Sequence, residues 1–591
     1  MKKIPGLFWG SLALLFITSE SRAQSCPQQI RGGWEAEFPL RKMFEISLLV
    51  QAADDNQYAA KLLSTSGSEE VAVWRDRQYL RLQSKLRPLS FEGRLSDDRR
   101  EITGFVDFAS NLYRLSLVAD GENSWSATWN PVPVSSEQVR LDLYFDDDGD
   151  GGTAGYFFFR DQRLPGLYGF GTRCNDRHVH VGEKNLALSF DGEFSVDYSQ
   201  LPMAVQGPGG TTAILFTAMS VLRSELPPGQ SDAGPRPDGH AGFLDRAPDK
   251  DGDNWSTEKP STAGANLSLL RRMVTTVAAG EFPLTHSVLV AHSGDLIVEE
   301  YFHGYDRFTL HDMRSASKSI ASTLVGLAID RRMLDSAASP ILPFFTEYRS
   351  VENWDAAKEN IRIRDLLTMS SGLDANDSDR DSVASEGAYQ SQTQRPDWIK
   401  LALDAPMIAE PGTRHIYGSA NPLILGGILD KVVGEQLQWF AEDQLFAPLG
   451  IENYRIYMDP TGVPYMGGGM HLRPRDMLKI GQMYLDGGRW QGRQVLSASW
   501  VAESFGKYGR LEPLERNGNE YGYLWWHENY AVNGETVDSI EARGNGGQYI
   551  FVVPKLGLAA VITSGNYRGG LKMTRQPQAV FEKFILPAFL H

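Results

Sequence analysis

A serine and a lysine three residues apart form the most chemically suggestive pair in the sequence. Ser315 and Lys318 stand at the start of an apolar stretch that continues to Ile329. On a helix, residues with this spacing lie about 5–6 Å apart at their Cβ atoms, so the lysine amine can reach the serine oxygen. Burial near a helix N-terminus disfavours the ammonium form, and the neutral amine can then accept a proton. The pair therefore predicts a nucleophilic serine activated by lysine.

The spacing alone is a weak signal, because it occurs twice more in the chain. Ser256 and Lys259 share it, as do Ser504 and Lys507. A proline follows the first of these lysines and a glycine interrupts the second pair, so neither setting is a strongly apolar helix. The position of Ser315 at the start of an apolar helix distinguishes it from both.

Further motifs follow the Ser315-Ala-Ser-Lys318 segment in a fixed order. They are Ile363-Arg-Asp-Leu-Leu-Thr-Met-Ser-Ser-Gly-Leu373, Pro411-Gly-Thr-Arg-His-Ile-Tyr417-Gly-Ser419 and Gly544-Asn-Gly-Gly-Gln548. This order resembles class C β-lactamases and their relatives, which include penicillin-binding proteins, esterases of β-lactamase fold and 6-aminohexanoate-dimer hydrolases. The likeness covers roughly Asn254 to His591, and Glu300-Tyr-Phe-His-Gly-Tyr305 resembles the aminohexanoate-hydrolase and esterase branch.

The resemblance implies both a fold and an activity. The expected fold is α+β and β-lactamase/transpeptidase-like, with an antiparallel sheet and helices, preceded by an all-β N-terminal domain. The expected activity is that of a serine hydrolase. The resemblance also assigns Tyr417 as the group that moves a proton between nucleophile, leaving group and water. An unperturbed phenol is a poor base at pH 7, so this role calls for a cation such as Lys318 to lower its pKa. The alternative for Tyr417 is a half-buried core aromatic.

Two departures from the family pattern bear on the substrate. Ser419 stands where the family has the asparagine of its Y-x-N motif, and the Lys-Thr-Gly triad is replaced by a segment that contains Arg543 and Gly544. Arg543 could restore the missing positive charge, or it could be an ordinary arginine at a strand end. We expect Ser419, Arg543 and Gly544 to contact substrate. Both departures favour an ester or a linear amide over a β-lactam.

An oxyanion hole needs only backbone N–H groups and is therefore unaffected by these departures. We expect the N–H of Ser315 to pair with that of Asn545 or Gly544. Two adjacent tryptophans, Trp525 and Trp526, are interpreted as core residues in preference to a substrate wall.

The pattern of the chain changes near its middle. Short alternating apolar runs from about Trp34 to Val221 predict strands, and residues 227–239 are rich in proline and glycine. We expect an all-β domain at 24–225, either a small barrel or a sandwich, then a linker at 226–250 and a hydrolase domain at 251–591. In the last part, the patterns predict a helix at 267–277, a hairpin around Gly294, and two closing strands at 549–553 and 558–562 that share its sheet.

The N-terminus has the pattern of an export signal at residues 1–23, with two lysines, an apolar stretch and small residues at the end. The apolar stretch is shorter than the roughly 20 residues that cross a bilayer, which disfavours a membrane anchor. We therefore expect a periplasmic or secreted protein without a stable membrane span. The two cysteines, Cys26 and Cys174, could pair in an oxidising compartment or remain isolated buried thiols.

No metal or cofactor is expected. Asp146, Asp148, Asp150 and Gly151 imitate a calcium-binding loop, but Phe157 stands where that loop requires a glutamate, so an acidic β-turn is favoured. A formal net charge of -16 argues against nucleic acid as a partner.

The leading hypothesis is thus an exported serine hydrolase that forms an acyl-enzyme on Ser315 with a small ester, amide or peptide. One alternative is a D-Ala-D-Ala peptidase or β-lactamase. Another is a β-lactam or peptide sensor with slow turnover, in which the β-rich half is the working part.

Overall fold

The computed structural model describes residues 26–218 and 242–590. Within these ranges the gaps are at 31, 39–44, 55–56, 65–66, 77, 86–88, 109, 130–138, 148–152, 160–168, 184–187, 208–209, 283, 303–304, 349, 380, 392–394, 513–519 and 567–574. The expected export signal and most of the expected linker therefore lie outside the described residues, as does the tip of the acidic turn. Among the described helices, none is long and apolar enough to cross a membrane.

The N-terminal half contains two β-barrels where the sequence predicted one all-β unit. The first barrel is closed and has the order β1-β10-β11-β12-β13-β14-β15-β16. Its strands are β1 (Gly32–Phe38), β10 (Val139–Asp147), β11 (Thr153–Phe159), β12 (Gly169–Asn175), β13 (His178–Glu183), β14 (Leu188–Glu193), β15 (Gln200–Gly207) and β16 (Gly210–Ala218). The expected acidic turn falls between the antiparallel strands β10 and β11.

The second barrel is inserted between β1 and β10. Its strands are β2 (Ile46–Asp54), β3 (Gln57–Ser64), β4 (Gly67–Asp76), β5 (Tyr79–Gln83), β6 (Leu89–Leu95), β7 (Glu101–Phe108), β8 (Asn111–Gly121) and β9 (Ser124–Trp129). Each strand pairs with the next, and β9 pairs with both β8 and β2, which closes the ring. Alternate residues of these strands point inward and fill the interior, among them Leu80, Leu82 and Phe91.

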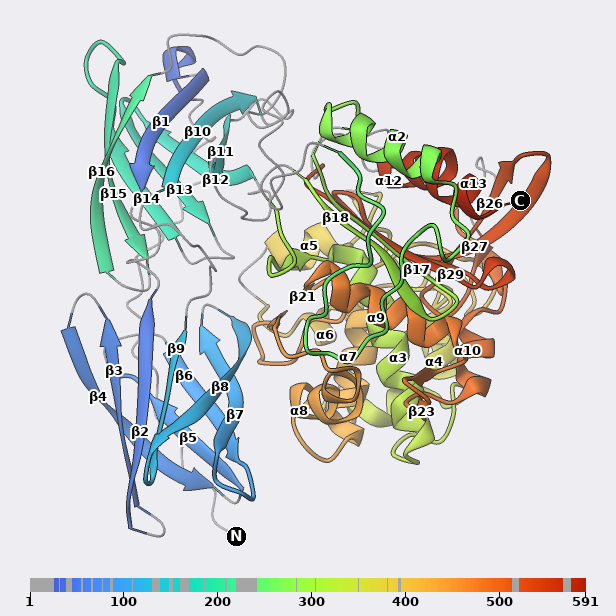
Figure 1. The fold of residues 1–591 in the computed structure, drawn as a ribbon. Coiled ribbons are helices and arrows are strands. Elements are labelled where there is room, and N and C mark those ends of the chain that lie inside the picture. The colour runs from blue at the N-terminus through green and yellow to red at the C-terminus, as the bar shows by residue number, and fades with distance from the viewer. Residues whose placement is uncertain are drawn as a thin grey trace.

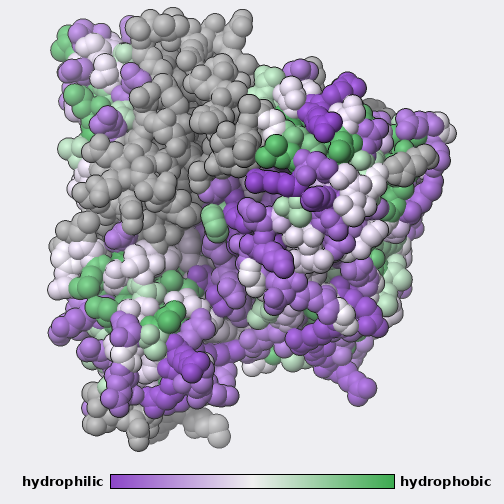
Figure 2. All heavy atoms as spheres, in the orientation of Figure 1, coloured by the Kyte–Doolittle hydropathy of each residue, from purple (hydrophilic) through white to green (hydrophobic). Residues whose placement is uncertain are grey.

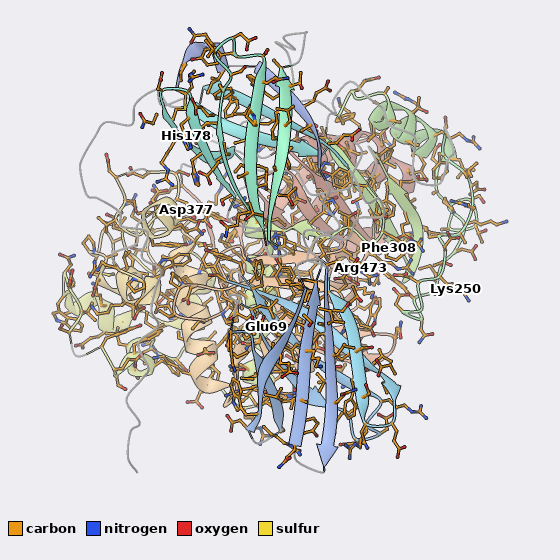
Figure 3. All side chains as sticks on the ribbon, turned by 90° about the vertical axis from the view of Figure 1, so that its left-hand side faces the viewer. Glu69, His178, Lys250, Phe308, Asp377 and Arg473 are labelled. Atoms are coloured by element: carbon orange, nitrogen blue, oxygen red, sulfur yellow. A yellow bond between two sulfur atoms is a disulfide. The ribbon has the colours of Figure 1, made fainter. Side chains whose placement is uncertain are left out.

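The two barrels lie one above the other along one side of the C-terminal half (Figures 1 and 3). Glu69 marks the second barrel and His178 the first in Figure 3. A disulfide joins Cys26 to Cys174 on β12, so the two cysteines that could pair do so. This bond fastens the start of the described chain to the first barrel. The second barrel lies between the two cysteines along the sequence.

An antiparallel sheet of eight strands is the centre of the C-terminal half. Its order is β18-β17-β29-β28-β27-β26-β25-β24. The strands are β17 (Thr285–His292), β18 (Asp295–Tyr301), β24 (Gly509–Arg510), β25 (Glu520–Tyr521), β26 (Trp526–Val532), β27 (Glu535–Gly544), β28 (Gln548–Val553) and β29 (Leu558–Ser564). The predictions of a hairpin near Gly294 and of a sheet that joins early and late strands are confirmed, because β17 pairs with both β18 and β29.

Helices cover both faces of this sheet (Figure 1). One face packs on α2 (Leu267–Ala278), α12 (Gln576–Val580) and α13 (Leu586–Phe589), and the other on a larger set. That set includes α3 (Ser317–Asp330), α4 (Ile363–Leu367), α6 (Trp398–Asp404), α7 (Ala420–Val432), α8 (Leu437–Ala441), α9 (Pro474–Leu485) and α10 (Ala498–Ser504), with α5 (Glu386–Ser391) nearby. Strand β28 shows why both faces are covered, since Tyr549 and Phe551 face one side and Ile550 and Val552 the other.

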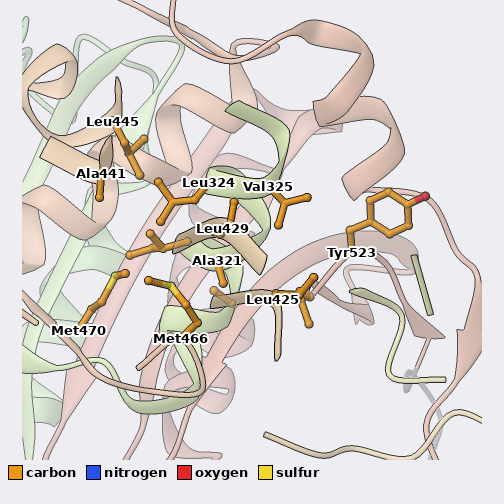
Figure 4. Packing of buried hydrophobic residues seen from close by; sticks show 14 of the residues in the cluster. Ala321, Leu324, Val325, Leu425, Leu429, Ala441, Leu445, Met466, Met470 and Tyr523 are labelled. Carbon is orange, nitrogen blue, oxygen red and sulfur yellow. The ribbon is translucent and has the colours of Figure 1, made fainter. Parts of the chain in front are cut away.

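Helix α3 lies at the centre of the larger set and is buried on every side from Ser317 to Ala328. Its sequence lacks a charged face because it has no solvent-exposed side until its last turn. Figure 4 shows Leu324 of α3 close to Leu429 of α7, with Met466 and Met470 nearby. Gly326 is required where α3 meets Trp500, since a Cβ there would lie 2.3 Å from the indole ring. The helix that carries Lys318 and follows Ser315 is thus firmly fixed.

The second barrel and the C-terminal half share a sheet and a core. Strand β8 pairs with β20 (Tyr454–Tyr457), which pairs with β21 (Met470–Leu472), which pairs with β19 (His311–Asp312). Phe105 on the outside of the barrel packs edge-on against the fully buried Trp439, with ring centroids 4.8 Å apart. In contrast to this apolar contact, the face of the C-terminal half that is visible in Figure 2 is largely hydrophilic.

Candidate active site

Ser315 lies in a tight turn that leads directly into α3. The turn is a 3-10 segment (Arg314–Ala316), and α3 begins at Ser317. Arg314 has a positive φ of 48°, which is uncommon for a residue other than glycine. The Asp312 carboxylate accepts a hydrogen bond from the Arg314 N–H at 2.9 Å and so holds this conformation. The strained turn presents a half-buried Ser315 side chain at the start of the helix.

Lys318 lies beside Ser315, as the spacing of the two residues predicted. Its Nζ is 2.9 Å from Ser315 Oγ, and it also donates to the Gly467 carbonyl. Lys318 is 1% exposed, and this burial lowers the pKa of its amine below the ordinary value, while the charges of Glu386 and Asp377 act in the opposite direction. Burial therefore favours the neutral amine that can accept the serine proton.

Tyr417 completes the group from the segment before α7. Its hydroxyl contacts Ser315, and its ring lies 5.1 Å from Lys318 Nζ and stacks on Trp526. We expected Lys318 to lower the pKa of Tyr417, but burial raises the pKa of this phenol well above its usual range. The charges of Asp377 and Glu386 act in the same direction as burial, while the hydrogen bond with Ser315 opposes it. Tyr417 is therefore a protonated phenol that can donate to and relay through Ser315.

Ser419 is not placed for the substrate contact expected of it. Its backbone N–H and hydroxyl both donate to Asp377 Oδ2, at 2.8 and 2.6 Å, and the side chain is completely buried. The Asp377 N–H in turn donates to the Tyr417 carbonyl at 3.1 Å. The serine therefore fixes the segment behind Tyr417, and its hydroxyl is used in that contact.

Asp377 and Glu386 are functional candidates that sequence reasoning missed. The Glu386 N–H donates to Asp377 Oδ1 at 2.8 Å, and the Tyr465 hydroxyl donates to Glu386 Oε1 at 2.6 Å. Burial raises the pKa of Asp377, and the nearby Lys318 opposes this. Figure 3 labels Asp377 within the C-terminal half. The only available signal was an acidic run that begins at Asp374, and nothing in it singles out Asp377.

Arg543 is occupied by acidic neighbours. Its Nε donates to Glu541 at 2.7 Å and its Nη2 to Glu528 at 2.8 Å, while its guanidinium lies 5.0 Å from the Trp526 ring. Two carboxylates therefore balance the positive charge that could have replaced the family lysine. Trp525 is fully buried, as the core interpretation predicted, but Trp526 is half-buried and supports Tyr417.

The end of β27 lies against the nucleophile turn. A Cβ on Gly544 would lie 2.1 Å from the Met313 carbonyl and 3.2 Å from the Ala316 nitrogen. Only glycine permits this approach. The next residue, Asn545, is exposed and bonds the Gly546 N–H through its own side chain at 2.8 Å. The backbone at Gly544 and Asn545 therefore runs past Ser315, where the expected oxyanion hole would form.

This arrangement defines a class of protein. A half-buried serine, a buried amine and a half-buried phenol in contact can form an acyl-serine and hydrolyse it. Among the described residues, no cluster of His, Cys, Asp and Glu could hold a metal ion. The site is that of a serine hydrolase in which lysine takes the place of histidine.

Comparison with known proteins identifies the family. The profile of the Beta-lactamase family matches residues 278–579, which is just over half of the chain, so the protein belongs to the β-lactamase family. It is 26% identical over 289 residues to the 6-aminohexanoate-dimer hydrolase of Paenarthrobacter ureafaciens, covering 46% of this chain and 70% of that protein.

Two further similar proteins either match a shorter part of this chain or have a lower sequence identity. A protein of Escherichia coli that is predicted to be a D-alanyl-D-alanine carboxypeptidase is 29% identical over 149 residues, covering 24% of this chain and 33% of the relative. The crystal structure of a penicillin-binding protein homologue from Caulobacter crescentus is 15% identical, with a TM-score of 0.43, and covers 54% of this chain and 97% of that one.

Proposed function

We propose that this protein is an exported hydrolase that cleaves an ester or a linear amide through an acyl-enzyme on Ser315. The observation that carries the proposal is the 2.9 Å distance between Ser315 Oγ and the nitrogen of the buried Lys318. No other pair with the S-x-x-K spacing lies in a comparable setting. Ser256 is exposed, and Lys507 forms ion pairs with Glu520 and Asp538.

The geometry supports the following route to the acyl-enzyme. Neutral Lys318 takes the Ser315 proton as Oγ attacks the substrate carbonyl, and the N–H groups of Ser315 and Asn545 bind the resulting oxyanion. Tyr417 then donates its proton to the leaving alcohol or amine as the C–O or C–N bond breaks. The protonated Lys318 returns that proton to Tyr417. In deacylation, water attacks the carbonyl of the acyl-enzyme and gives one proton to Lys318 and Tyr417. That proton passes to Ser315 Oγ as the ester bond breaks, and the acid is released.

The substrate class is inferred from the charges around the site. Two carboxylates compensate Arg543, and Ser419 is held by Asp377, so neither is placed to grip the carboxylate of a β-lactam. A neutral ester or a linear amide needs no such cation. Likeness to a 6-aminohexanoate-dimer hydrolase is consistent with a linear amide.

Export is part of the proposal. The Cys26–Cys174 disulfide supports it, because such bonds persist in oxidising compartments such as the periplasm. The signal-like pattern at residues 1–23 supports it as well. We therefore infer a periplasmic or secreted location.

Activity-based labelling tests the proposal. The mature protein is incubated with a fluorophosphonate, a panel of nitrophenyl esters and nitrocefin, beside Ser315→Ala and the matched control Ser256→Ala. We expect labelling and ester hydrolysis in the wild type and the control, and neither in Ser315→Ala. Ester hydrolysis that survives in Ser315→Ala would refute the mechanism. Fast nitrocefin turnover would reverse the substrate ranking, and labelling without turnover would favour the sensor alternative.

A further inference from the structure

A row of four side chains crosses from the second barrel to the nucleophile turn. The strand registers place Tyr113 of β8 opposite Arg455 of β20, Arg455 opposite His471 of β21, and His471 opposite Asp312 of β19. Residues that are directly opposite in antiparallel strands project on the same side and are within reach of one another. The second barrel is thus connected to the residue that holds the Arg314 turn.

Hydrogen bonds link Tyr113, Arg455 and His471, and His471 packs against Asp312 at the end of the row. Arg455 Nη1 donates to the Tyr113 hydroxyl at 3.3 Å, and the guanidinium lies 5.5 Å from the Tyr113 ring centroid. Arg455 Nη2 also donates to His471 Nε2, which lies 3.7 Å from Asp312 Oδ2. Burial lowers the pKa of His471 to about 3, so its imidazole is neutral and can accept from Arg455.

All four side chains are buried, with exposed fractions of 4% for Tyr113, 6% for Arg455, 4% for His471 and 4% for Asp312. Buried polar groups depend on their partners, since water cannot replace a lost contact. We therefore expect a change at the barrel end to disturb the groups that follow it in the row.

The row ends at the catalytic turn. Asp312 binds Arg314 through its backbone N–H at 2.9 Å and through its guanidinium at 3.1 Å, and Arg314 precedes Ser315 with a left-handed backbone. Strand β21 holds the same turn from the other side, because the Met313 N–H donates to the Met470 carbonyl at 3.0 Å. Such a conformation persists only where its surroundings impose it.

We propose that the second barrel is a working part of the catalytic centre, with Tyr113 and Arg455 as positioning residues that hold the Ser315 turn through His471 and Asp312. The barrel acts through the placement of Ser315 and does not touch the substrate. This inference rests on the proposed function, because it assumes that Ser315 is the nucleophile.

The test measures the single-turnover rate at which a fluorophosphonate acylates the full-length protein, together with kcat and KM for an ester. Because small misplacements of a nucleophile are costly, we expect Arg455→Met to slow acylation by about tenfold or more, with KM nearly unchanged. Tyr113→Phe should give a smaller loss in the same direction. Arg455→Lys, which keeps the charge and one donor, should recover part of the rate.

Two comparisons separate positioning from general stability. Arg94→Met breaks another contact between the barrel and the C-terminal half, since Arg94 pairs with Glu435 and Asp443, and it should lower the melting temperature without slowing acylation. Tyr113→Phe added to Arg455→Met should cause little further loss, because both belong to one row.

Wild-type acylation rates in Tyr113→Phe and Arg455→Met would overturn the inference, as would equal slowing in Arg94→Met. If Arg455→Met fails to fold, an unchanged rate in Tyr113→Phe suffices to overturn it. Failure of the proposed function is recognised separately, because Ser315→Ala would then keep its ester hydrolysis.

Discussion

Lys318 shows how burial creates a base from a side chain that is ordinarily a cation. Its amine is enclosed, bonded to Gly467 and adjacent to Ser315, and its pKa is lowered. Only the unprotonated amine can take the serine proton. The rate of acylation should therefore rise as pH increases through the lowered pKa of Lys318, and reach a plateau above it.

Arginine at this position should abolish acylation. Lys318→Arg replaces the amine with a guanidinium, which does not lose its proton in the working pH range. We expect a loss of kcat/KM of about a thousandfold or more, comparable to the loss of a general base. Stopped-flow labelling over a pH series measures both the wild-type profile and the variant. A wild-type rate that does not rise with pH anywhere below about 10, near the reference pKa of lysine, would contradict the assignment of Lys318 as base.

Asp377 offers a second test at this scale. Its charge stabilises the protonated form of Lys318 and so raises the pKa of the amine. Asp377→Asn removes that charge, and the rising limb of the pH–rate profile should move to lower pH. Asp381→Asn changes an exposed acid in the same segment and should leave the limb in place. Equal profiles for the two variants would show that Asp377 does not influence the base.

The sequence revealed the site residues that are close together along the chain and missed those that the fold brings in from elsewhere. Ser315 lies in the helical turn that leads directly into the helix of Lys318, so their separation along the chain fixes their separation in space. Asp377 reaches the site through the fold of its segment onto Tyr417, which no spacing reveals. The orientation of Ser419 depends on the same contact and was therefore not foreseen.

At the scale of elements, the contact between β27 and the nucleophile turn depends on one missing side chain. Gly544→Ala would place a Cβ 2.1 Å from the Met313 carbonyl and must push the strand away. We expect acylation to fall by about a hundredfold, with a stability loss of about 1–3 kcal/mol from overpacking. Gly242→Ala has open space around its added carbon and serves as a control. Acylation kinetics and thermal melts of both variants measure these effects. A normal acylation rate in Gly544→Ala would show that the contact between β27 and the Ser315 turn does not set the rate.

Element types were predictable where the pattern was local. The helix at 267–277 and the closing strands at 549–553 and 558–562 correspond to α2, β28 and β29. Alternation also predicted strands between Trp34 and Val221. It could not show that β9 returns to pair with β2, or that β8 has β20 as a further partner, because those pairings join segments far apart along the chain.

At the scale of the whole molecule, the disulfide stabilises the first barrel, whereas the shared sheet connects the second barrel to the C-terminal half. The Cys26–Cys174 bond encloses the inserted second barrel with a separation of 148 residues, and chain entropy alone suggests a contribution of about 4–5 kcal/mol. Replacing both cysteines with alanine should lower the unfolding free energy of the first barrel while ester hydrolysis persists. Chemical denaturation and activity of the variant, with and without reductant, measure this. Loss of hydrolysis in a protein that remains folded would show that the first barrel also supports the site.

The central claim concerns one covalent bond, and trapping that bond tests it most directly. The protein is mixed with an activated ester, quenched in acid within the acylation phase, digested and examined by mass spectrometry. The account predicts the acyl mass on the peptide that contains Ser315, with no adduct in Ser315→Ala. An adduct on a different residue, or hydrolysis with undiminished rate in Ser315→Ala, would contradict it.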